Sequence, residues 1–550
     1  MREIDRLTTS VSGIPSLSLM QAAADACFAA ISDHFAGELS GKRAQVLCGP
    51  GNNGGDGAAL AIALCRAGVR TEILLFGTVA ATKGDARTNF ESAQEFAGQE
   101  ANHSLVSFTE CKDEADWDEE LGRVKQVPDL IVDALFGTGL TRPLEGIFRS
   151  VVQHVNLLRS ARERLPGVRT IVVSVDLPSG LNADTSRIVG PNIEADLTVT
   201  FTAPKIANLV SPAGQHNGKL VVAGIGSPDH LLANANANSF VIEEKDARDW
   251  LIKTRYRSAS FKNIHGHVLV IAGSRGYTGA AVLCGNAAMR SGAGLVTIAT
   301  PASAQASISA SVMPEVMTTA LAETDRGAVS DEAVDHVRQL AAKATVIAIG
   351  PGLSAEDERT RRFVYSVVKQ RQTPVVIDAD ALNCLAKYSA NGWPEELQGS
   401  KEAPLILTPH AGEMLRLLGT TDKTALDDRV AVAREFATCH KLILVLKGAR
   451  SLIAAPDGRV FINPTGNAGL GTAGAGDTLT GIIAGFIAQS ATGFYDEANA
   501  LFGVIAALYV GGLAGDFAAR KLGMRAMVAS DIRKHLSAAI RSLDPKGETP

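Results

Sequence analysis

The sequence predicts two α/β domains, each with a largely parallel β-sheet covered by helices, and three observations lead to this fold class. Short apolar runs rich in β-branched residues alternate with helix-compatible stretches, which is typical of parallel sheets with crossover helices. The chain has 550 residues, more than one hydrophobic core usually supports. A short, polar and repetitive segment, residues 231–240, separates two series of such runs.

The first series consists of strand-like runs that each end near a small or polar residue. They are residues 44–48, 70–76, 129–136, 169–176 and 196–201. Between the first two, residues 57–68 carry apolar side chains at helical spacing and end on a glycine, the pattern of a covering helix. We therefore expect a first domain over residues 1–228 and a linker over residues 229–240.

The second series shows the same alternation. Its strand-like runs are residues 266–274, 293–300, 344–352, 373–380, 404–409 and 442–448. We expect a second domain over residues 241–542, and because no internal repeat relates the two halves, the two domains are expected to differ. Ligands of open parallel sheets bind outside the carboxyl ends of the strands, so the loops after these runs should hold the site residues.

Composition narrows the classes of function. The hydrophobic fraction of 46%, the charged fraction of 20% and the net charge of -5 fit a soluble protein and give no electrostatic case for nucleic acid or anionic membrane. Two uncharged runs, residues 478–495 and 498–515, reach membrane-spanning length, but small and polar residues dilute both, so buried helices are predicted. The seven cysteines form no CxxC pair and no secretory signal is recognisable, which favours a reducing cytoplasm. Small molecules are the expected ligands.

The stretch GPGNNGGDG, residues 49–57, joins a strand-like run to a helix-like run. A glycine-rich turn at a helix N-terminus can cradle phosphate, because unpaired N–H groups and the positive helix end face the anion, and glycines let the backbone approach it. The alternative is a tight turn in which the glycines only supply unusual dihedral angles. Asn52, Asn53 and Asp56 favour a ligand site, since a bare turn needs no such concentration of side-chain oxygens.

Two further loops carry a carboxylate beside glycines. Asp133 precedes FGTGLTRP, and Asp176 begins DLPSG. A phosphate cradle with several oxygen ligands for a hard cation would explain all three loops together. The alternative for each aspartate alone is a helix cap or turn.

The strings SGIPSLSLMQAAADA, GPGNNGGDG, VDALFGTGL and VDLPSGLNADT resemble the N-terminal domain of the bifunctional NAD(P)H-hydrate repair enzymes, over roughly residues 1–225. The resemblance implies a Rossmann-like three-layer fold, NAD(P)H-hydrate epimerase activity, and a K⁺ ion bound by Asn53, Asp133 and Ser179. Our hypothesis is that Asp176 is catalytic and moves a proton while the C6 oxygen or the C–O bond is transiently released. The implied nucleotide contacts are Asn52, Asn53, Gly54, Gly55, Asp56, Gly137, Thr138, Gly139, Leu140, Thr141, Arg142, Pro143 and Asp176.

Residues 463–486 place a long loop of small residues directly before an apolar helix. Gly474, Ala475 and Gly476 would leave backbone N–H groups free to hold a transferring phosphoryl group, and Asp477 could take a proton from an attacking hydroxyl. The alternative is a glycine-rich packing turn with Asp477 as a first-turn carboxylate. The length of the loop and the apolar helix that follows it favour phosphoryl transfer.

This loop resembles the GAGD signature of ribokinase-like folds. With the strings at residues 265–301, 349–353, 376–383, 407–414 and 445–456, it resembles the ADP-dependent (S)-NAD(P)H-hydrate dehydratase domain over roughly residues 240–540. The resemblance implies that Asp477 is the catalytic base. Contacts with the hydrated nucleotide would come from Ala280, Gly352, His410 and Asp477, and contacts with ADP or AMP from Lys447, Gly448, Ala449, Arg450, Ser451 and Gly476.

The implied dehydratase reaction phosphorylates the C6 hydroxyl from ADP, after which phosphate leaves and NAD(P)H and AMP remain. Phosphorylation turns a poor leaving group into a good one. The resemblance alone supplies ADP as the co-substrate, Mg²⁺ in the dehydratase domain, and NADHX and NADPHX as the substrates. A homo-oligomer is also expected.

Two other functions share part of this pattern. A ribokinase-like kinase for a small alcohol would also use Gly476 and Asp477, but it does not explain an epimerase-like half. Domains that resemble the first half also serve as RNA-decapping scaffolds or lipoprotein-binding modules. That interpretation predicts eroded ligand positions, whereas Asp133, Asp176 and Ser179 are all present.

Overall fold

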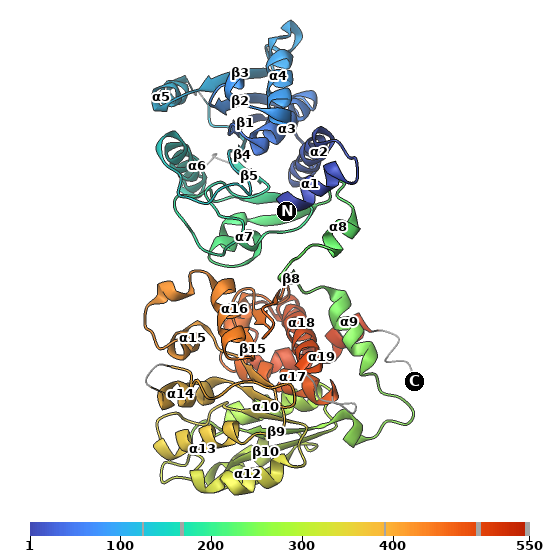
Figure 1. Cartoon of the computed structure of the whole chain (residues 1–550), viewed down its shortest axis with the longest axis vertical. Coiled ribbons are helices and arrows are strands. Elements are labelled where there is room, and N and C mark those ends of the chain that lie inside the picture. Colours follow the sequence, from blue (N-terminus) through green and yellow to red (C-terminus); the bar gives the residue numbers. More distant parts are fainter. Residues whose placement is uncertain (124–125, 165–169, 390–391, 491–496, 545–550) are drawn as a thin grey trace. The chain divides into compact units, whose positions relative to one another are not determined.

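The computed structural model describes residues 1–123, 126–164, 170–389, 392–490 and 497–544 (Figure 1). The chain divides into two compact units, which are described separately. Unit 1 comprises Met1–Asn236 with Asp427–Arg429, and unit 2 comprises Ala237–Leu426 with Val430–Pro550.

Unit 1 is built on a seven-stranded sheet in which every neighbouring pair is parallel. In sheet order the strands are β3 (Val106–Cys111), β2 (Arg70–Phe76), β1 (Arg43–Cys48), β4 (Leu130–Ala134), β5 (Ile171–Val175), β6 (Leu197–Phe201) and β7 (Lys219–Ala223). The helices are α1 (Arg2–Ser10), α2 (Ser16–His34), α3 (Asn52–Arg66), α4 (Gly84–Gly98), α5 (Glu114–Arg123), α6 (Gly146–Arg164), α7 (Ile206–Leu209) and α8 (Asp229–Ala233). The strand order reverses between β1 and β4, and ligands bind at such a switch point in sheets of this kind.

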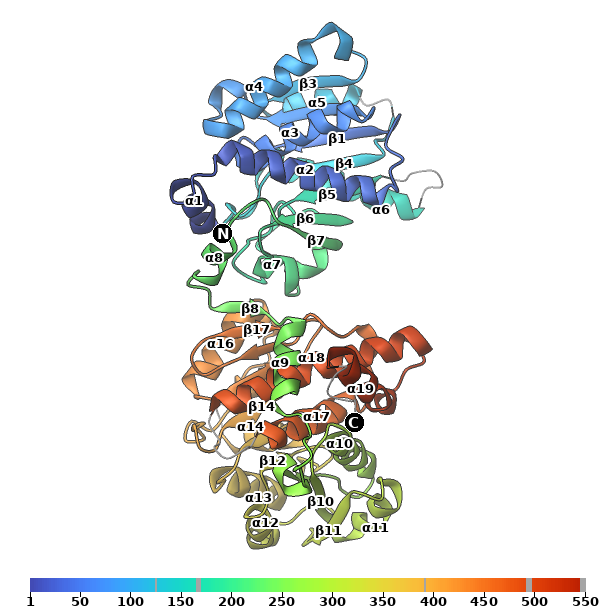
Figure 2. The ribbon, with the colours of Figure 1, turned by 90° about the vertical axis from the view of Figure 1, so that its right-hand side faces the viewer.

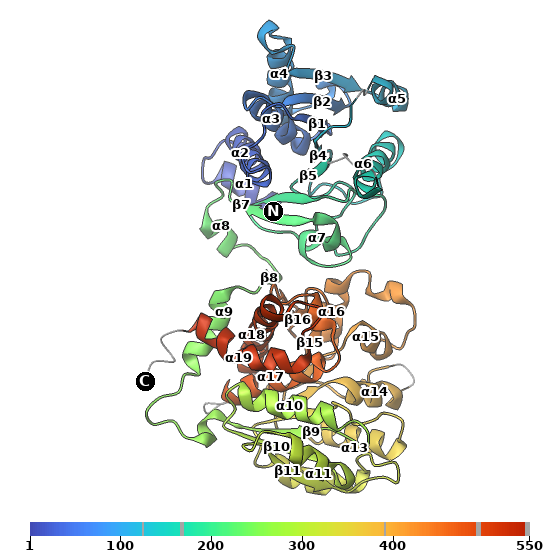
Figure 3. The same ribbon diagram turned by 180° about the vertical axis from the view of Figure 1, so that it is seen from behind.

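Two hydrophobic cores flank this sheet and make three layers. One core joins α2, α3 and α4 to the strands, and the other joins α5 and α6 to the opposite face. Figures 1 and 3 show these two groups of helices on opposite sides of the strands. The Rossmann-like three-layer fold expected of the first half is therefore confirmed.

The glycines after β1 belong mostly to helix α3, which corrects the expected loop. The turn is only residues 49–51, and α3 begins at Asn52. A Cβ atom on Gly54 would lie 1.8 Å from the carbonyl oxygen of Gly49, and one on Gly57 would lie 2.5 Å from Cβ of Ala134. Gly54 therefore lets the start of α3 pack closely against the turn after β1, and Gly57 lets the helix pack closely against β4.

Unit 2 is built on a ten-stranded sheet that is parallel except where β16 pairs with β15 and β17. In sheet order the strands are β11 (Met317–Leu321), β10 (Leu295–Pro301), β9 (His267–Ile271), β12 (Val346–Ile349), β13 (Val375–Ile377), β14 (Leu405–Leu407), β15 (Ile443–Leu446), β16 (Leu452–Ala454), β17 (Val460–Ile462) and β8 (Ser239–Val241). The helices are α9 (Glu244–Lys253), α10 (Thr278–Arg290), α11 (Ala302–Ser311), α12 (Val334–Ala341), α13 (Glu358–Lys369), α14 (Ala379–Tyr388), α15 (Ala411–Leu417), α16 (Arg429–Cys439), α17 (Ala475–Ser490), α18 (Glu497–Leu522) and α19 (Ala529–Leu543). The expected linker, residues 229–240, contains α8 and the first two residues of β8.

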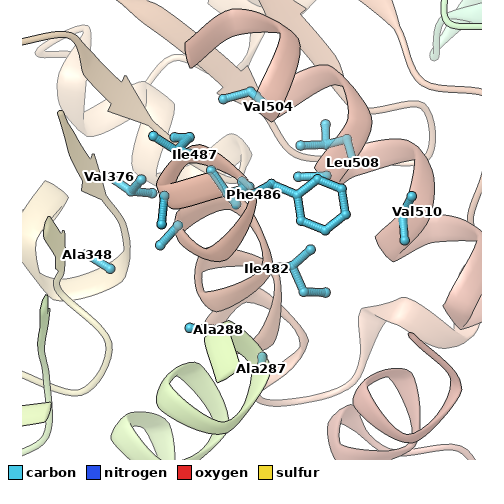
Figure 4. Close-up of a cluster of buried hydrophobic side chains, with 14 of the residues drawn as sticks. Ala287, Ala288, Ala348, Val376, Ile482, Phe486, Ile487, Val504, Leu508 and Val510 are labelled. Carbon is cyan, nitrogen blue, oxygen red and sulfur yellow. The ribbon is translucent and has the colours of Figure 1, made fainter. Parts of the chain in front are cut away.

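Helix α17 lies at the centre of the core of unit 2. Its side chains Ile482, Phe486 and Ile487 pack among residues of α10, α18, β12 and β13 (Figure 4). Figure 2 shows α17, α18 and α19 close to α10, and these four helices contact one another. This packing fixes the N-terminus of α17, and with it the small-residue loop, at the edge of the sheet.

The two uncharged runs lie largely in core helices. Residues 478–490 belong to α17, and residues 491–495 lie outside the described part of the chain. Within the described residues, Asn499–Leu522 has the length and hydropathy, 1.7, of a membrane span, but 72% of that window is buried inside the protein. This is what a core helix shows.

Candidate active sites

The first candidate site is a cavity of about 740 Å³ in unit 1, where the loops after β1, β4, β5 and β6 meet. Seven of the residues implied by the resemblance line it: Asn52, Asn53, Asp56, Gly137, Thr138, Gly139 and Asp176. The six others, Gly54, Gly55, Leu140, Thr141, Arg142 and Pro143, are not among its lining residues. The cavity lies at the switch point of the sheet, where a nucleotide site is expected.

Asp176 is the first residue after β5 and has a positive φ of 65°. A non-glycine residue rarely adopts this conformation, and such backbone strain is concentrated at functional sites. Carboxylate oxygen Oδ1 accepts a hydrogen bond from the Thr200 hydroxyl at 3.1 Å and one from the Lys205 ammonium at 2.5 Å. The carboxylate is thereby fixed at the wall of the cavity.

Lys205 is a buried lysine that the sequence did not single out. Only 6% of its side chain is exposed, and its ammonium also donates to the Thr200 hydroxyl at 2.8 Å and to the Phe201 carbonyl at 3.1 Å. All three donors of the ammonium are therefore used. The available signal was its position in TAPK, directly after β6, where site residues of parallel sheets gather.

Asp133 and Ser179 form a buried polar centre beside the cavity. The Asp133 carboxylate accepts hydrogen bonds from the Ser174 hydroxyl at 2.8 Å, the Ser179 amide at 2.8 Å and the Ser179 hydroxyl at 2.5 Å. Burial raises the pKa of Asp133, and these hydrogen bonds partly oppose the rise. The Ser179 hydroxyl also accepts from the Phe136 amide at 2.9 Å.

Asn53 lies against the loop that follows β4. A Cβ atom on Gly137 would be 3.1 Å from Asn53 Oδ1 and 3.3 Å from Asp176 Oδ2, so the two side chains lie close to the backbone of this loop. The amide nitrogen of Asn53 is buried without a hydrogen-bond partner among the described residues. Carboxylate, hydroxyl and amide oxygens are hard donors, so the chemistry of Asn53, Asp133 and Ser179 suits K⁺.

Asp56 adds a second carboxyl group to the cavity. Its Oδ1 atom is buried and has no hydrogen-bond partner among the described residues. Burial raises the pKa of Asp56, and the nearby carboxylates of Asp176 and Asp5 raise it further. Asp5 comes from α1, a helix in which the sequence indicated no site residue.

The second candidate site lies in unit 2, where β13, β14 and β15 end beside the N-terminus of α17. Its centre is Asp378, a buried carboxylate directly after β13. It accepts hydrogen bonds from the Lys447 ammonium at 2.7 Å, the Thr408 hydroxyl at 2.8 Å and the Thr480 hydroxyl at 2.7 Å. Asp378, Thr408 and Thr480 were not predicted as site residues.

Asp477 lies in the first turn of α17, next to this centre. Burial and the neighbouring Asp378 raise its pKa to about 6, although the Lys447 ammonium acts in the opposite direction. A carboxyl group with such a pKa can accept a proton near neutral pH. A Cβ atom on Gly476 would lie 3.3 Å from the Lys447 nitrogen, so the ammonium lies close to the backbone of this turn.

His410 is connected to the same site through Glu413. His410 caps α15, because its Nδ1 atom accepts a hydrogen bond from the Gly412 amide at 2.9 Å, and the Glu413 carboxylate accepts one from the His410 amide at 2.8 Å. A Glu413 oxygen lies 3.9 Å from the Lys447 nitrogen. His410 therefore has a structural function as a cap, while its ring remains 55% exposed to a ligand.

The remaining predicted residues of unit 2 fall in two places. Ala280 and Gly352 adjoin, because a Cβ atom on Gly352 would lie 3.0 Å from that of Ala280, and Gly352 has a positive φ of 65°. Gly448, Ala449, Arg450 and Ser451 form the turn between β15 and β16. In that turn the Arg450 guanidinium donates to the Pro464 carbonyl at 2.9 Å, which joins it to the start of the small-residue loop.

Comparison with known proteins agrees with this division into two sites. A family model described as "YjeF-related protein N-terminus" matches residues 16–207, and one described as "NAD(P)H-hydrate dehydratase" matches residues 268–538. Among solved structures, an ADP/ATP-dependent NAD(P)H-hydrate dehydratase from Bacillus subtilis, co-crystallised with ATP/Mg²⁺, is 31% identical and has a TM-score of 0.45. The match covers 56% of this chain and 100% of that chain.

Curated relatives match along the whole chain. The bifunctional NAD(P)H-hydrate repair enzyme Nnr of Moorella thermoacetica is 41% identical over 100% of this chain and 97% of its own length. The protein of the same name from Escherichia coli is 31% identical over 97% of this chain and 91% of its own length. These matches confirm the resemblance drawn from the motifs. The chain therefore belongs to the family of bifunctional NAD(P)H-hydrate repair enzymes.

Proposed function

We propose that unit 1 epimerises (R)- and (S)-NAD(P)H-hydrate at C6 and that unit 2 dehydrates the S form to NAD(P)H at the expense of ADP. The observation that carries this is the match to a bifunctional relative over the full chain. Each unit also presents an aspartate, Asp176 or Asp477, at the carboxyl edge of its sheet. The chain is thus an isomerase and a lyase that repairs damaged cofactor.

In unit 1, Asp176 acts as the proton carrier of the epimerisation. Lys205 holds its carboxylate with one oxygen, Oδ1, while Oδ2 faces Gly137 across the cavity. The carboxylate accepts the proton of the C6 hydroxyl as the C6–N bond opens and its electron pair passes to the ring nitrogen, and it returns the proton when the nitrogen closes the ring on the other face of C6. Asn52 and the start of α3 supply N–H groups for the nucleotide phosphates.

The residues of unit 1 fit a K⁺ ion. Asn53, Asp133 and Ser179 would hold it, and Ser179 keeps an oxygen lone pair for it after bonding Asp133 and Phe136. A bound K⁺ ion would supply positive charge next to the substrate phosphates. In this proposal Asp133 binds the K⁺ ion, and Asp176 transfers the proton.

In unit 2, Asp477 accepts the proton of the C6 hydroxyl as that oxygen attacks the terminal phosphoryl group of ADP. The Lys447 ammonium and the backbone N–H groups of Gly476 and Asp477 stabilise the charge that develops on the transferred group. The phosphate then leaves with the electron pair of its bond to C6, assisted by the lone pair of the ring nitrogen, and a proton is lost from C5 to solvent, which restores the C5–C6 double bond of the dihydronicotinamide. The turn at Gly448–Ser451 and Gly476 contacts the adenine nucleotide, and Ala280, Gly352 and His410 contact the hydrated one.

Among the described residues, no group of three His, Cys, Asp or Glu side chains could hold a metal ion. The Asp378 carboxylate is occupied by three hydrogen bonds. Mg²⁺ commonly binds through substrate phosphates, so we propose that it enters with ADP. We also propose domain limits of 1–228 and 241–542 and a homo-oligomer. The proposed location is the cytoplasm, and the free cysteines support it because thiols stay reduced in that compartment.

The products of the reaction test this function. Purified protein with a mixture of both NADPH-hydrate epimers, ADP and K⁺ should form NADPH, AMP and phosphate in equal amounts. No conversion of either epimer would instead indicate a small-alcohol kinase or a binding module.

A further inference from the structure

Asp378 is a buried carboxylate to which the proposed reaction assigns no contact with either nucleotide. Only 1% of its side chain is exposed. Oxygen Oδ1 accepts from Lys447 and Thr408, and oxygen Oδ2 accepts from Thr480 at 2.7 Å. Three donors, two directly after β14 and β15 and one on α17, therefore fix the orientation of this one carboxylate.

Asp378 is ionised in the folded protein. Burial alone would raise its pKa, but the Lys447 ammonium and the hydroxyls of Thr480 and Thr408 outweigh burial and lower it. Burial likewise works against the charge of Lys447, and Asp378 and Glu413 restore it by raising the pKa of the ammonium. Each charge therefore depends on the other.

The pair lies directly behind the N-terminus of α17. A Cβ atom on Gly476 would be 3.3 Å from the Lys447 nitrogen and 3.7 Å from Asp378 Oδ2. A lysine side chain has large rotamer freedom, and the hydrogen bond of 2.7 Å to the fixed Asp378 carboxylate restricts the Lys447 ammonium.

We propose that Asp378 is a positioning residue for phosphoryl transfer: it holds the Lys447 ammonium beside the N-terminus of α17 and keeps a fixed negative charge next to Asp477. This inference rests on the proposed dehydratase function. Asp378 would affect the rate of dehydration through Lys447 and Asp477, without contact with the substrate.

The charges around Asp477 give the expected direction of a pH effect. Asp378, Asp380 and Glu413 raise its pKa, and Lys447 lowers it. His410 contacts this group only through Glu413, and the thiol of Cys284 has a pKa raised by burial and is neutral. Removal of the Asp378 charge should therefore move the ionisation of Asp477 to lower pH.

The test uses Asp378→Asn and Lys447→Met, alone and together, in the full-length chain. Asp378→Asn should lower kcat/KM for dehydration on the order of 10²-fold, the effect of a misplaced catalytic group, and shift the acid limb of the pH profile downward. If Asp378 acts through Lys447, the double variant should lose far less than the product of the two single losses. The melting transition of unit 2 shows whether each variant is folded, and epimerisation by the same chain shows that unit 1 is unaffected.

Asp380→Asn is the matched control. Asp380 also lies near Asp477, and its carboxylate accepts a hydrogen bond from the Ser354 amide at 2.9 Å. It should shift the acid limb slightly and keep most of kcat/KM. Should Asp378→Asn fail to fold, Thr480→Val removes one of the three bonds and should lower kcat/KM several-fold.

Wild-type kcat/KM and an unmoved acid limb in folded Asp378→Asn, or in folded Thr480→Val if the first does not fold, would overturn the inference. Fully multiplicative losses in the double variant would do the same. Failure of the wild-type chain to dehydrate the hydrate would instead refute the proposed function, so the two failures are distinguishable.

Discussion

Replacement of Lys205 by methionine tests the structure of the first site most severely. The side chains of Lys205 and Asp176 are 6% and 12% exposed, so the variant leaves a carboxylate buried without its ammonium. Removing one partner of a buried ion pair destabilises a protein by about 3–5 kcal/mol. Asp56 and Asp5 lie in the same cavity, and they add to the repulsion.

The loss can be converted to a melting temperature. In a unit of this size, 1 kcal/mol corresponds to roughly 2–4 °C, so the transition of unit 1 should fall by roughly 6–20 °C. Epimerisation should fall on the order of 10²-fold or more, because the proton carrier loses its fixed orientation. Scanning calorimetry and separate assays of the two activities measure these effects.

The double variant Lys205→Met/Asp176→Asn separates stability from catalysis. It carries no uncompensated charge, so it should regain most of the lost stability and remain inactive as an epimerase. Dehydration of the pure S epimer serves as the internal reference for unit 2. A fall of less than about 1 kcal/mol in the single variant, or a double variant less stable than the single one, would refute the buried ion pair.

Three further predictions follow from the contacts. Gly54→Ala should destabilise unit 1 and abolish epimerisation, because the new methyl group would meet the Gly49 carbonyl. Gly98→Ala is the control: it has open space around it and should change neither stability nor activity. Melting followed by circular dichroism and the epimerisation rate distinguish the two variants. Asp477→Asn should abolish dehydration and leave epimerisation intact. In the wild type, kcat/KM for dehydration should rise tenfold per pH unit up to the pKa of Asp477, about 6, and then level off. A flat pH profile from pH 5 to 8 would contradict the assignment of Asp477 as the base. Ser179→Ala should weaken the activation of epimerisation by K⁺, measured as the K⁺ concentration for half-maximal rate, and an unchanged value would exclude Ser179 as a ligand.

The central strands were predictable because both faces of a parallel sheet are covered. Every run expected from the sequence contains a strand, and these runs are almost continuously apolar. The edge strands β3, β7, β11 and β8 were not predicted, because side chains on them are partly exposed and carry no continuous apolar signal. The three-residue strands β16 and β17 are too short for any periodicity to be recognised.

The glycines after β1 show a different limit. A run such as GPGNNGGDG predicts that something approaches the backbone closely, but it does not say whether that is a ligand or another part of the protein. Only the neighbours of Gly54 and Gly57 in the folded chain answer that question.

Lys205 and Asp378 were not found because each acquires its partner only on folding. Lys205 bonds Asp176, 29 positions earlier, and Asp378 bonds Lys447, 69 positions later. Asp176 and Asp477 were predicted as site residues because their loops carry recognisable motifs. A search for charged residues at the carboxyl end of each strand-like run would have included Asp378 and come within four residues of Lys205.

The recovery of dihydronicotinamide absorbance from a mixture of epimers tests the central claim, two independent active sites in one chain. The wild-type protein with ADP and K⁺ should restore the absorbance completely, and Asp176→Asn should stop at the fraction that was S at the start. Complete recovery by Asp176→Asn at the wild-type rate would show that this aspartate does not epimerise the substrate. A wild-type plateau at the S fraction would show that unit 1 is not an epimerase.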